Sequence, residues 1–223
     1  MTVKIFWKDP YQTELRAHLT EVNGTVVKLD KTIFFAFSGG QESDHGSIAN
    51  IPVKDARKVG HEIEYTLAQK CDLTVGDRVT VKIDWQRRYQ LMRLHFAAEL
   101  VLEIMSAQLQ GSEKIGAHIA QDKARIDFLW HENINPLLPN ILKQAETIIQ
   151  SDVAIIKDYS DKENQLRYWQ IPGFAKVPCG GTHIKTTGEV GDLRLKRKNI
   201  GKNKERVEIY LVNSSSYNSN KFI

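Results

Sequence analysis

The sequence predicts an α+β fold in which a small β-barrel domain, residues 1–86, precedes a larger domain, residues 87–223, with helices packed on an antiparallel sheet. Two observations lead to this expectation. Up to about residue 85 the chain consists of short β-like segments broken by Gly, Asn and Asp, as in small barrels and sandwiches. From residue 87 the apolar residues take up helical spacing, and strand patterns return only later.

Short strands account for the first domain. Residues 14–22 alternate loosely between polar and apolar side chains, and Asn23-Gly24 is a typical hairpin turn. Further strands are predicted at residues 25–29, 33–37, 62–67 and 78–84. Several short strands separated by turn residues favour a barrel or a sandwich over a layered fold with long helices.

Helices dominate the start of the second domain. Residues 87–110 contain no Gly or Pro and predict a helix that ends at Gly111. Its apolar residues recur at helical spacing, namely Leu91, Leu94, Ala98, Val101, Leu102 and Met105. A second helix is predicted at residues 136–151, which begin with proline and carry an apolar face. Strands are expected within 115–129 and at 153–156, 166–170, 190–196 and 205–212.

Composition restricts the class of protein. The 223 residues carry a formal net charge of +4, and 41% of them are hydrophobic, which is ordinary for a globular chain. Only two cysteines occur, Cys71 and Cys179, so a reducing compartment is favoured over a disulfide-stapled scaffold. Charges interrupt the apolar runs, and none approaches the length of about 18 residues that a membrane span needs. We therefore expect a cytoplasmic protein without a membrane partner.

Positive charge gathers towards the C-terminus. Residues 194–206 contain a single acid, Glu205, and seven basic residues: Arg194, Lys196, Arg197, Lys198, Lys202, Lys204 and Arg206. Such a stretch can bind phosphates. The alternative is a solvated hairpin with charged edges. The charge pattern alone does not choose between the two.

The sharpest local motif is Pro178-Cys-Gly-Gly-Thr-His183, which places a thiol and an imidazole four positions apart around two glycines. Zinc binds this pair of ligands readily. One such pair arises often by chance, so it needs partners. They are found in the first helix, where His95 and Glu99 stand at i and i+4 and share one helix face.

These residues predict a zinc site formed by His95, Cys179 and His183, with Glu99 as a fourth ligand or as a nearby base. Three protein ligands and an open position are typical of a catalytic zinc, whereas four favour a structural or substrate-orienting one. The residues leave this choice open. His45, His118 and His131 remain further candidate ligands.

A glycine-containing loop, Ser38-Gly-Gly-Gln-Glu-Ser-Asp-His-Gly46, follows a predicted strand. Backbone N–H groups at Gly39 and Gly40 are not shielded by side chains, so the loop can approach a phosphate or a ribose closely. An ordinary turn between two strands is the alternative.

Taken in order, these segments resemble a known family, the freestanding alanyl-tRNA editing proteins, which are related to the editing domains of alanyl- and threonyl-tRNA synthetases. The motifs that carry the resemblance span most of the chain: Asp9-Pro-Tyr11, Phe34-Phe-Ala-Phe-Ser-Gly-Gly-Gln41 with Asp44 and Gly46, Asp84-Trp-Gln-Arg-Arg-Tyr89, Met92-Arg-Leu-His95, Cys179-Gly-Gly-Thr-His183 and Thr187-Gly-Glu-Val-Gly191. Several ordered motifs are far more specific than one. The resemblance implies an N-terminal β-barrel with the glycine motif and a C-terminal α/β editing domain that binds one zinc ion.

The resemblance also implies a reaction, the zinc-dependent hydrolysis of the ester that joins serine, or sometimes glycine, to the tRNA for alanine. His95 falls on the first histidine of the family's His-x-x-x-His motif, and Cys179 and His183 fall on its Cys-x-x-x-His motif. Glu99 replaces the second helix histidine, and Phe96 stands where a small hydroxyl residue is common. We expect His95 and Glu99 to act at the reacting ester.

Contacts with the mischarged tRNA are expected at three places. Thr182 is a candidate for a catalytic contact with the serine hydroxyl, because a polar site left unpaired penalises alanine. The motif Gly39-Gly40-Gln41 is expected to contact substrate or tRNA. Four basic residues would hold acceptor-stem phosphates, namely Lys196, Arg197, Lys198 and Lys202. No ATP-binding segment is evident, so amino-acid activation is not expected, and the oligomeric state stays open.

Three other functions stay open on the residues. Peptide-chain release factors use a Gly-Gly-Gln tripeptide to cleave peptidyl-tRNA, although a β domain ahead of metal ligands suits them poorly. Glu99 can close a four-ligand structural site, which would make the chain a zinc-stabilised RNA-binding module. Glu99 can also have altered the amino-acid specificity or ended the editing activity of a family member.

Overall fold

The computed structural model describes residues 1–70 and 72–212, so Cys71 lies outside the described residues. Within them the chain is a mixed α+β protein, mostly strands with two α-helices, as the sequence predicts. It divides into two compact units. One comprises Met1–Met92 and Gly181–His183, and the other comprises Arg93–Gly180 and Ile184–Ile223.

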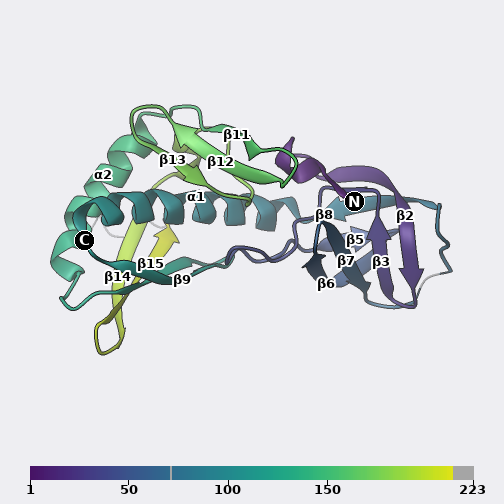
Figure 1. Ribbon diagram of the computed structural model, residues 1–223, viewed down its shortest axis with the longest axis horizontal. Coiled ribbons are helices and arrows are strands. Elements are labelled where there is room, and N and C mark those ends of the chain that lie inside the picture. The colour runs from purple at the N-terminus through teal and green to yellow at the C-terminus, as the bar shows by residue number, and fades with distance from the viewer. Residues whose placement is uncertain (71, 213–223) are drawn as a thin grey trace, which may run out of the picture. The chain divides into compact units, whose positions relative to one another are not determined.

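Strands of the first unit pair in a ring (Figure 1). The order is β2 (Glu14–Asn23), β3 (Val26–Leu29), β7 (Glu62–Leu67), β6 (Ile51–Val59), β5 (Gly46–Ile48) and β8 (Arg78–Ile83), and β8 pairs again with β2. All these pairings are antiparallel. A short parallel pair of β1 (Val3–Lys4) and β4 (Lys31–Thr32) and the 3-10 helix η1 (Ile5–Trp7) complete the unit.

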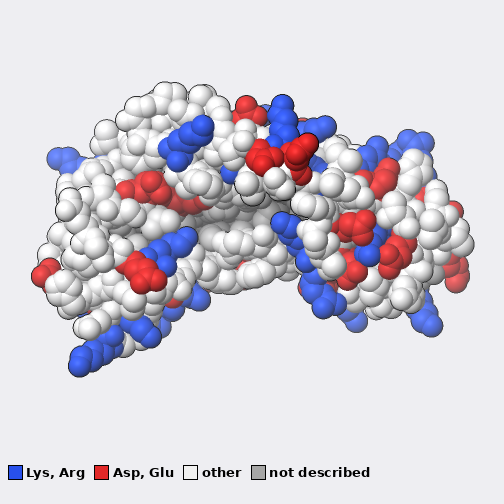
Figure 2. All heavy atoms as spheres, in the orientation of Figure 1, with Lys and Arg blue, Asp and Glu red and all other residues white. Residues whose placement is uncertain are grey.

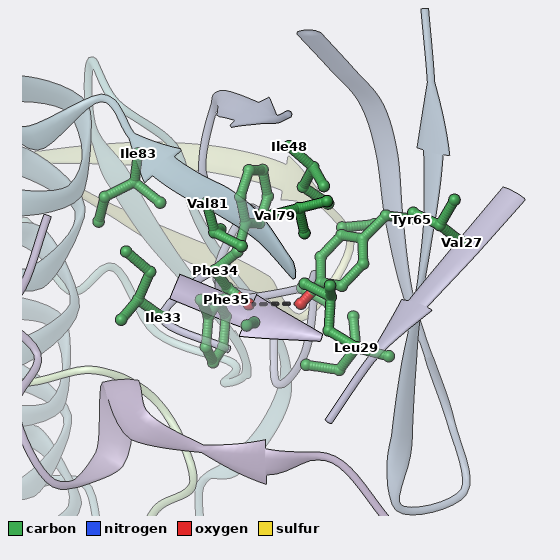
Figure 3. Packing of buried hydrophobic residues seen from close by; sticks show 14 of the residues in the cluster. Val27, Leu29, Ile33, Phe34, Phe35, Ile48, Tyr65, Val79, Val81 and Ile83 are labelled. Atoms are coloured by element: carbon green, nitrogen blue, oxygen red, sulfur yellow. Dashed lines mark hydrogen bonds between the residues drawn. The ribbon is translucent and has the colours of Figure 1, made fainter. Parts of the chain in front are cut away.

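The core of the first unit is formed by the inward side chains of these strands (Figure 3). Val27, Val81 and Tyr65 are completely buried, and each belongs to a different strand of the ring. The Tyr65 hydroxyl donates a hydrogen bond to the Thr32 hydroxyl at 2.7 Å and lies 3.3 Å from the Phe34 carbonyl oxygen. Because a buried phenol needs a polar partner, this contact fixes the ring of Tyr65 in the core.

Residues 33–37 form no strand, so that prediction is wrong. Ile33, Phe34, Phe35 and Ala36 are all buried, whereas a strand at the surface of a core buries every second residue. Side chains replace the ladder of backbone hydrogen bonds: the Phe35 amide donates to Asp44 Oδ2 at 2.6 Å, and Arg88 Nη2 donates to the Ile33 carbonyl at 2.6 Å. The segment is therefore held by residues far along the chain.

Two sheets and two helices form the second unit (Figure 1). A four-stranded sheet has the order β14 (Leu193–Gly201), β15 (Lys204–Leu211), β10 (Ala124–Leu129) and β9 (Glu113–Ile119). A three-stranded sheet has the order β11 (Ile156–Asp161), β12 (Leu166–Ile171) and β13 (Ala175–Pro178). The helices are α1 (Trp85–Gln108), which begins in the first unit, and α2 (Leu138–Gln150), with 3-10 helices η2 (Asn135–Leu137) and η3 (Thr187–Val190).

Helix α1 begins at Trp85 because Asp84 caps it: Asp84 Oδ1 accepts the Arg87 amide at 3.0 Å. From Leu91 to Met105 apolar residues are buried on all sides of the helix, as expected for a helix enclosed by other elements. In Figure 1 this part of α1 runs between the three-stranded and the four-stranded sheet.

Two further strand predictions differ from the structure. Residues 153–156 contribute only an isolated bridge at Ala154, because their backbone pairs with the segment around Thr186 and β11 begins at Ile156. The last hairpin begins at Leu193 rather than at residue 190, since the η3 turn occupies the preceding residues. Sequence patterns also failed to predict β1, β4, β5, β6, β11 and β13.

Candidate metal centre

Four potential ligand side chains come from two places in the chain. Helix α1 carries His95 and Glu99 one turn apart, and Cys179 and His183 belong to the segment that follows β13. Their ligand atoms all lie within 4.8 Å of one another. His45, His118 and His131 are not part of this cluster among the residues that the structure describes.

Two distances within the cluster match those expected around a tetrahedral metal ion. His95 Nε2 lies 3.5 Å from Cys179 Sγ and 3.4 Å from Glu99 Oε1. A zinc ion with bonds of about 2.0–2.3 Å separates neighbouring ligand atoms by roughly 3.3–3.6 Å. Two imidazoles, a thiolate and a carboxylate are also ligand types that zinc accepts. The residues therefore fit a zinc ion, and both distances to His95 are consistent with Glu99 as a ligand.

Negative charge surrounds the buried imidazole of His95, which is 5% exposed. Burial by itself lowers the pKa of His95, but the charges of Glu99 and Cys179 outweigh it and raise that pKa well above 6.5. Burial, together with the charge of Glu99, also raises the pKa of Glu103 one turn further along α1. A divalent cation stabilises such a cluster, because it replaces the proton and neutralises both anionic groups.

Strand β12 and its neighbour β11 hold the ligand segment. The Cys179 amide donates to the Arg167 carbonyl at 2.8 Å, and Lys157 Nζ donates to the Ile184 carbonyl at 2.9 Å. Burial lowers the pKa of both Arg167 and Lys157. Sequence reasoning missed both residues, because a cation in a strand has no local pattern that separates it from a surface charge.

A capping box fixes the far end of the ligand segment. Glu189 Oε1 accepts the amides of Lys185 at 2.7 Å and Thr186 at 3.1 Å, at the start of η3. The same arrangement explains the glycine at position 188, because a Cβ there would lie 2.4 Å from Asp152 Oδ1. The motif Thr187-Gly-Glu-Val-Gly191 thus has a structural explanation.

The Gly39-Gly40-Gln41 motif forms a tight turn in which Ser38 and Gln41 bridge. Both glycines have positive φ, 61° and 86°, a conformation that side chains with a Cβ rarely adopt. The turn aims the Gln41 side chain at Thr182: Gln41 Nε2 donates to Thr182 Oγ1 at 2.8 Å, and the Thr182 amide donates to Gln41 Oε1 at 3.2 Å. Gln41 is 0% exposed and Thr182 is 1% exposed, so both hydrogen bonds are buried.

Asp44 and Gly46 support this turn. Asp44 forms a completely buried ion pair with Arg88 of α1. Gly46 lies against the backbone of β8, where a Cβ would come within 2.0 Å of the Lys82 carbonyl oxygen. Both motif residues therefore connect the loop to its own unit and do not project into a site.

The other residues singled out by the sequence fall in separate places. Phe96 is buried next to His95 and packs edge to face on Trp169, with ring centroids 5.2 Å apart. Lys196, Lys198 and Lys202 are exposed on the β14–β15 hairpin. Arg197 lies on the opposite face of β14, half-buried, where its guanidinium binds both carboxylate oxygens of Glu205 at 2.5 Å. Arg197 thus does not share a surface with Lys196 and Lys198.

Comparison with known proteins matches the chain over nearly its full length. It is 33% identical over 223 residues to alanyl-tRNA editing protein AlaX-M of Pyrococcus horikoshii, covering 95% of this chain and 98% of the relative. The chain belongs to the alanyl-tRNA editing protein family. AlaX-M of Saccharolobus solfataricus is 32% identical, covering 93% of this chain and 98% of the relative. The resemblance inferred from the motifs is confirmed.

Members of this family share sequence with synthetases. An alanine–tRNA ligase of Ignicoccus hospitalis is 32% identical over 87% of this chain, but the match covers only 24% of the ligase. Residues 3–87 match the family model for class II (A) tRNA synthetases, and residues 166–208 match the second additional domain of threonyl- and alanyl-tRNA synthetases. In the part of the chain that the structure describes, neither helix is both long and apolar enough to span a bilayer.

Proposed function

We propose that this chain hydrolyses the ester bond of mischarged tRNA for alanine, removing serine and in some cases glycine, in a zinc-dependent manner. Family membership supports the reaction, because the relatives that match over their full length are named alanyl-tRNA editing proteins. The ligand quartet of His95, Glu99, Cys179 and His183 is the observation that carries the zinc dependence. The relatives' names, which refer to alanyl-tRNA editing, support a tRNA as the partner.

Two domains divide this work in the proposal. The six-strand ring is taken as the small β-barrel that the family resemblance implies, within residues 1–86. Residues 87–223 act as the editing domain, since they contribute all four ligand side chains. The barrel supplies Gln41 to the same chemistry through its hydrogen bonds with Thr182.

A zinc ion held by His95, Cys179 and His183 would supply Lewis acidity, which either acidifies a water molecule or orients the substrate. Glu99 is the fourth ligand in this proposal, because its carboxylate oxygen lies 3.4 Å from His95 Nε2. Its charge lowers the net positive charge of the site relative to a histidine at the same position. A protein with Glu99 therefore needs more help from its own side chains to activate water.

Thr182 provides the discrimination between serine and alanine. Its hydroxyl oxygen accepts one hydrogen bond from Gln41 Nε2, which leaves the hydroxyl hydrogen and one lone pair for the serine side chain. With alanine in the site these groups stay unsatisfied in a buried environment, which costs about 1–3 kcal/mol. Gln41 positions Thr182 and does not itself need to touch the substrate.

The test is deacylation of seryl-tRNA(Ala) and alanyl-tRNA(Ala), with and without a zinc chelator. We expect loss of serine, sparing of alanine, and inhibition by the chelator that added zinc reverses. Cys179→Ala should lose both bound metal and turnover, whereas His131→Ala, which changes an exposed histidine outside the cluster, should keep both. No hydrolysis by metal-loaded, folded protein would contradict the proposal.

A non-catalytic role is the second candidate, because Glu99 completes four protein ligands, the number typical of structural zinc. In that case the chain is a zinc-stabilised tRNA-binding protein. Chelation would then unfold the second unit, and tRNA would bind without hydrolysis. Chelation that stops turnover but leaves the fold intact would favour the enzyme.

A further inference from the structure

Side chains on the four-stranded sheet separate by charge according to the face they occupy. Register pairs Arg194 with Tyr210, Lys196 with Glu208 and Lys198 with Arg206, and then Arg206 with Asp127 and Glu208 with Arg125. Because directly paired residues project on the same side, these residues share one face, which we call the basic face. Residues between them, such as Leu195, Val207 and Ile126, form the core face.

Cations cover the acids on the basic face. Glu208 has a side-chain exposure of 7% and bonds to Lys123, which is 35% exposed. Asp127 is 10% exposed beneath Arg125 and Arg206, which are 31% and 20% exposed. Solvent therefore meets guanidinium and ammonium groups, while the carboxylates are withdrawn below them.

Strand β14 adds a row of cations at the edge of this face. Arg194, Lys196 and Lys198 are all exposed and two residues apart, so they follow one another at about 6.6 Å. No ion pair joins any of them to an acid in residues 1–70 and 72–212. In Figure 2, Lys and Arg gather over the β14–β15 hairpin. The face carries seven cations, the three of this row with Lys123, Arg125, Lys204 and Arg206, against three acids, Asp127, Glu208 and Glu113, which leaves four positive charges in excess.

We propose that the basic face binds the phosphate backbone of double-helical RNA. In this proposal the row of Arg194, Lys196 and Lys198 lies along one of the two RNA strands. The inference rests on the proposed function and assigns the acceptor stem of the tRNA to this surface. It differs from a general basic tail, because Arg197 lies on the core face and takes no part.

The surface fits a duplex better than an unpaired strand. Proteins that bind single strands stack bases on exposed aromatic rings. Tyr210 lies on the basic face, and its ring is covered by the Arg194 guanidinium, 4.5 Å from the ring centroid, and by Lys123 Nζ at 5.8 Å. Cations without a free aromatic surface instead bind phosphates, which fixes position and carries no base sequence.

Binding of an RNA hairpin that reproduces an acceptor stem and carries no amino acid tests this surface without using the hydrolytic reaction. The variant R194Q/K196Q/K198Q removes three charges from the row. Its control, K54Q/R57Q/K58Q, removes three charges from exposed residues of β6. Circular dichroism and thermal unfolding verify that each variant folds, as expected for exposed substitutions.

We expect the β14 variant to bind the hairpin roughly ten-fold or more weakly at physiological salt, and the slope of log affinity against log salt to fall by about two to three. The β6 variant should keep the wild-type slope. Equal affinity of the β14 variant and wild type, an equal loss in the β6 variant, or preference of the wild type for a single strand of the same length would overturn the proposal. Absence of seryl-tRNA hydrolysis by the wild type, in contrast, would contradict the proposed function and leave this binding result standing.

Discussion

The ion pair of Asp44 and Arg88 allows a quantitative prediction about the first unit. Both side chains are 0% exposed. Arg88 also donates to the Pro10 carbonyl at 2.9 Å and the Ile33 carbonyl at 2.6 Å, and Asp44 accepts the Phe35 amide. One guanidinium thus holds together the start of α1, the segment after β4 and the loop that carries Gln41.

Asp44→Asn removes the carboxylate that pairs with Arg88 and keeps the size of the side chain. A buried charge left without its partner costs about 3–5 kcal/mol. Since domains are typically stable by about 5–15 kcal/mol, the variant should lose roughly a fifth or more of its stability. With a urea dependence of about 3 kcal/mol/M, the midpoint should fall by roughly 1–1.7 M.

Urea unfolding followed by tryptophan fluorescence measures this loss. The control is Asp55→Asn, which breaks an exposed pair with Arg57 in which the side chains are 53% and 67% exposed, and it should cost less than about 1 kcal/mol. The double variant D44N/R88M should recover part of the loss, because it also removes the stranded charge. A loss for Asp44→Asn no larger than that of Asp55→Asn would refute the reasoning.

Three further predictions concern the metal, the backbone and pH. Glu99→Ala should weaken zinc affinity at least about 10-fold in a chelator competition, while Glu103→Ala, one turn further along α1, should leave it unchanged; equal effects would remove Glu99 from the ligands. Gly46→Ala should cost about 1–3 kcal/mol in urea unfolding, because its Cβ would lie 2.0 Å from a backbone oxygen, and a midpoint like that of wild type would contradict this close approach. Burial, with the charge of Lys58, lowers the pKa of Lys4 to about 8 from 10.5, so the unfolded chain binds more protons between these values and stability rises with pH. This group should add about 2 kcal/mol between pH 7 and 9.5, and Lys4→Met should lose that part of the rise; an identical rise in both proteins would show that Lys4 does not cause it.

Local patterns were sufficient for the elements whose periodicity is complete within one segment. Helix α1 was predicted within two residues at each end, because its apolar spacing and the absence of Gly and Pro are visible in the sequence. Asn23-Gly24 predicted its hairpin in the same way, since the turn chemistry belongs to those two residues. The candidate ligands could be named because zinc uses few residue types, and His95 and Glu99 share a helix face by spacing alone.

Contacts between distant residues were decided only by the tertiary structure. Residues 33–36 resemble a strand in sequence. In the structure Asp44, Tyr65 and Arg88 hydrogen-bond to the backbone within residues 33–35, and all four side chains of residues 33–36 are buried. Gln41 and Thr182 are 141 residues apart, and no local sequence pattern predicts that their side chains meet. The register of β14 with β15 separates Arg197 from Lys196 and Lys198, which adjoin it in sequence. Short-range periodicity is a property of each segment, whereas pairing and burial depend on which segments meet, and that is set by the free energy of the whole chain.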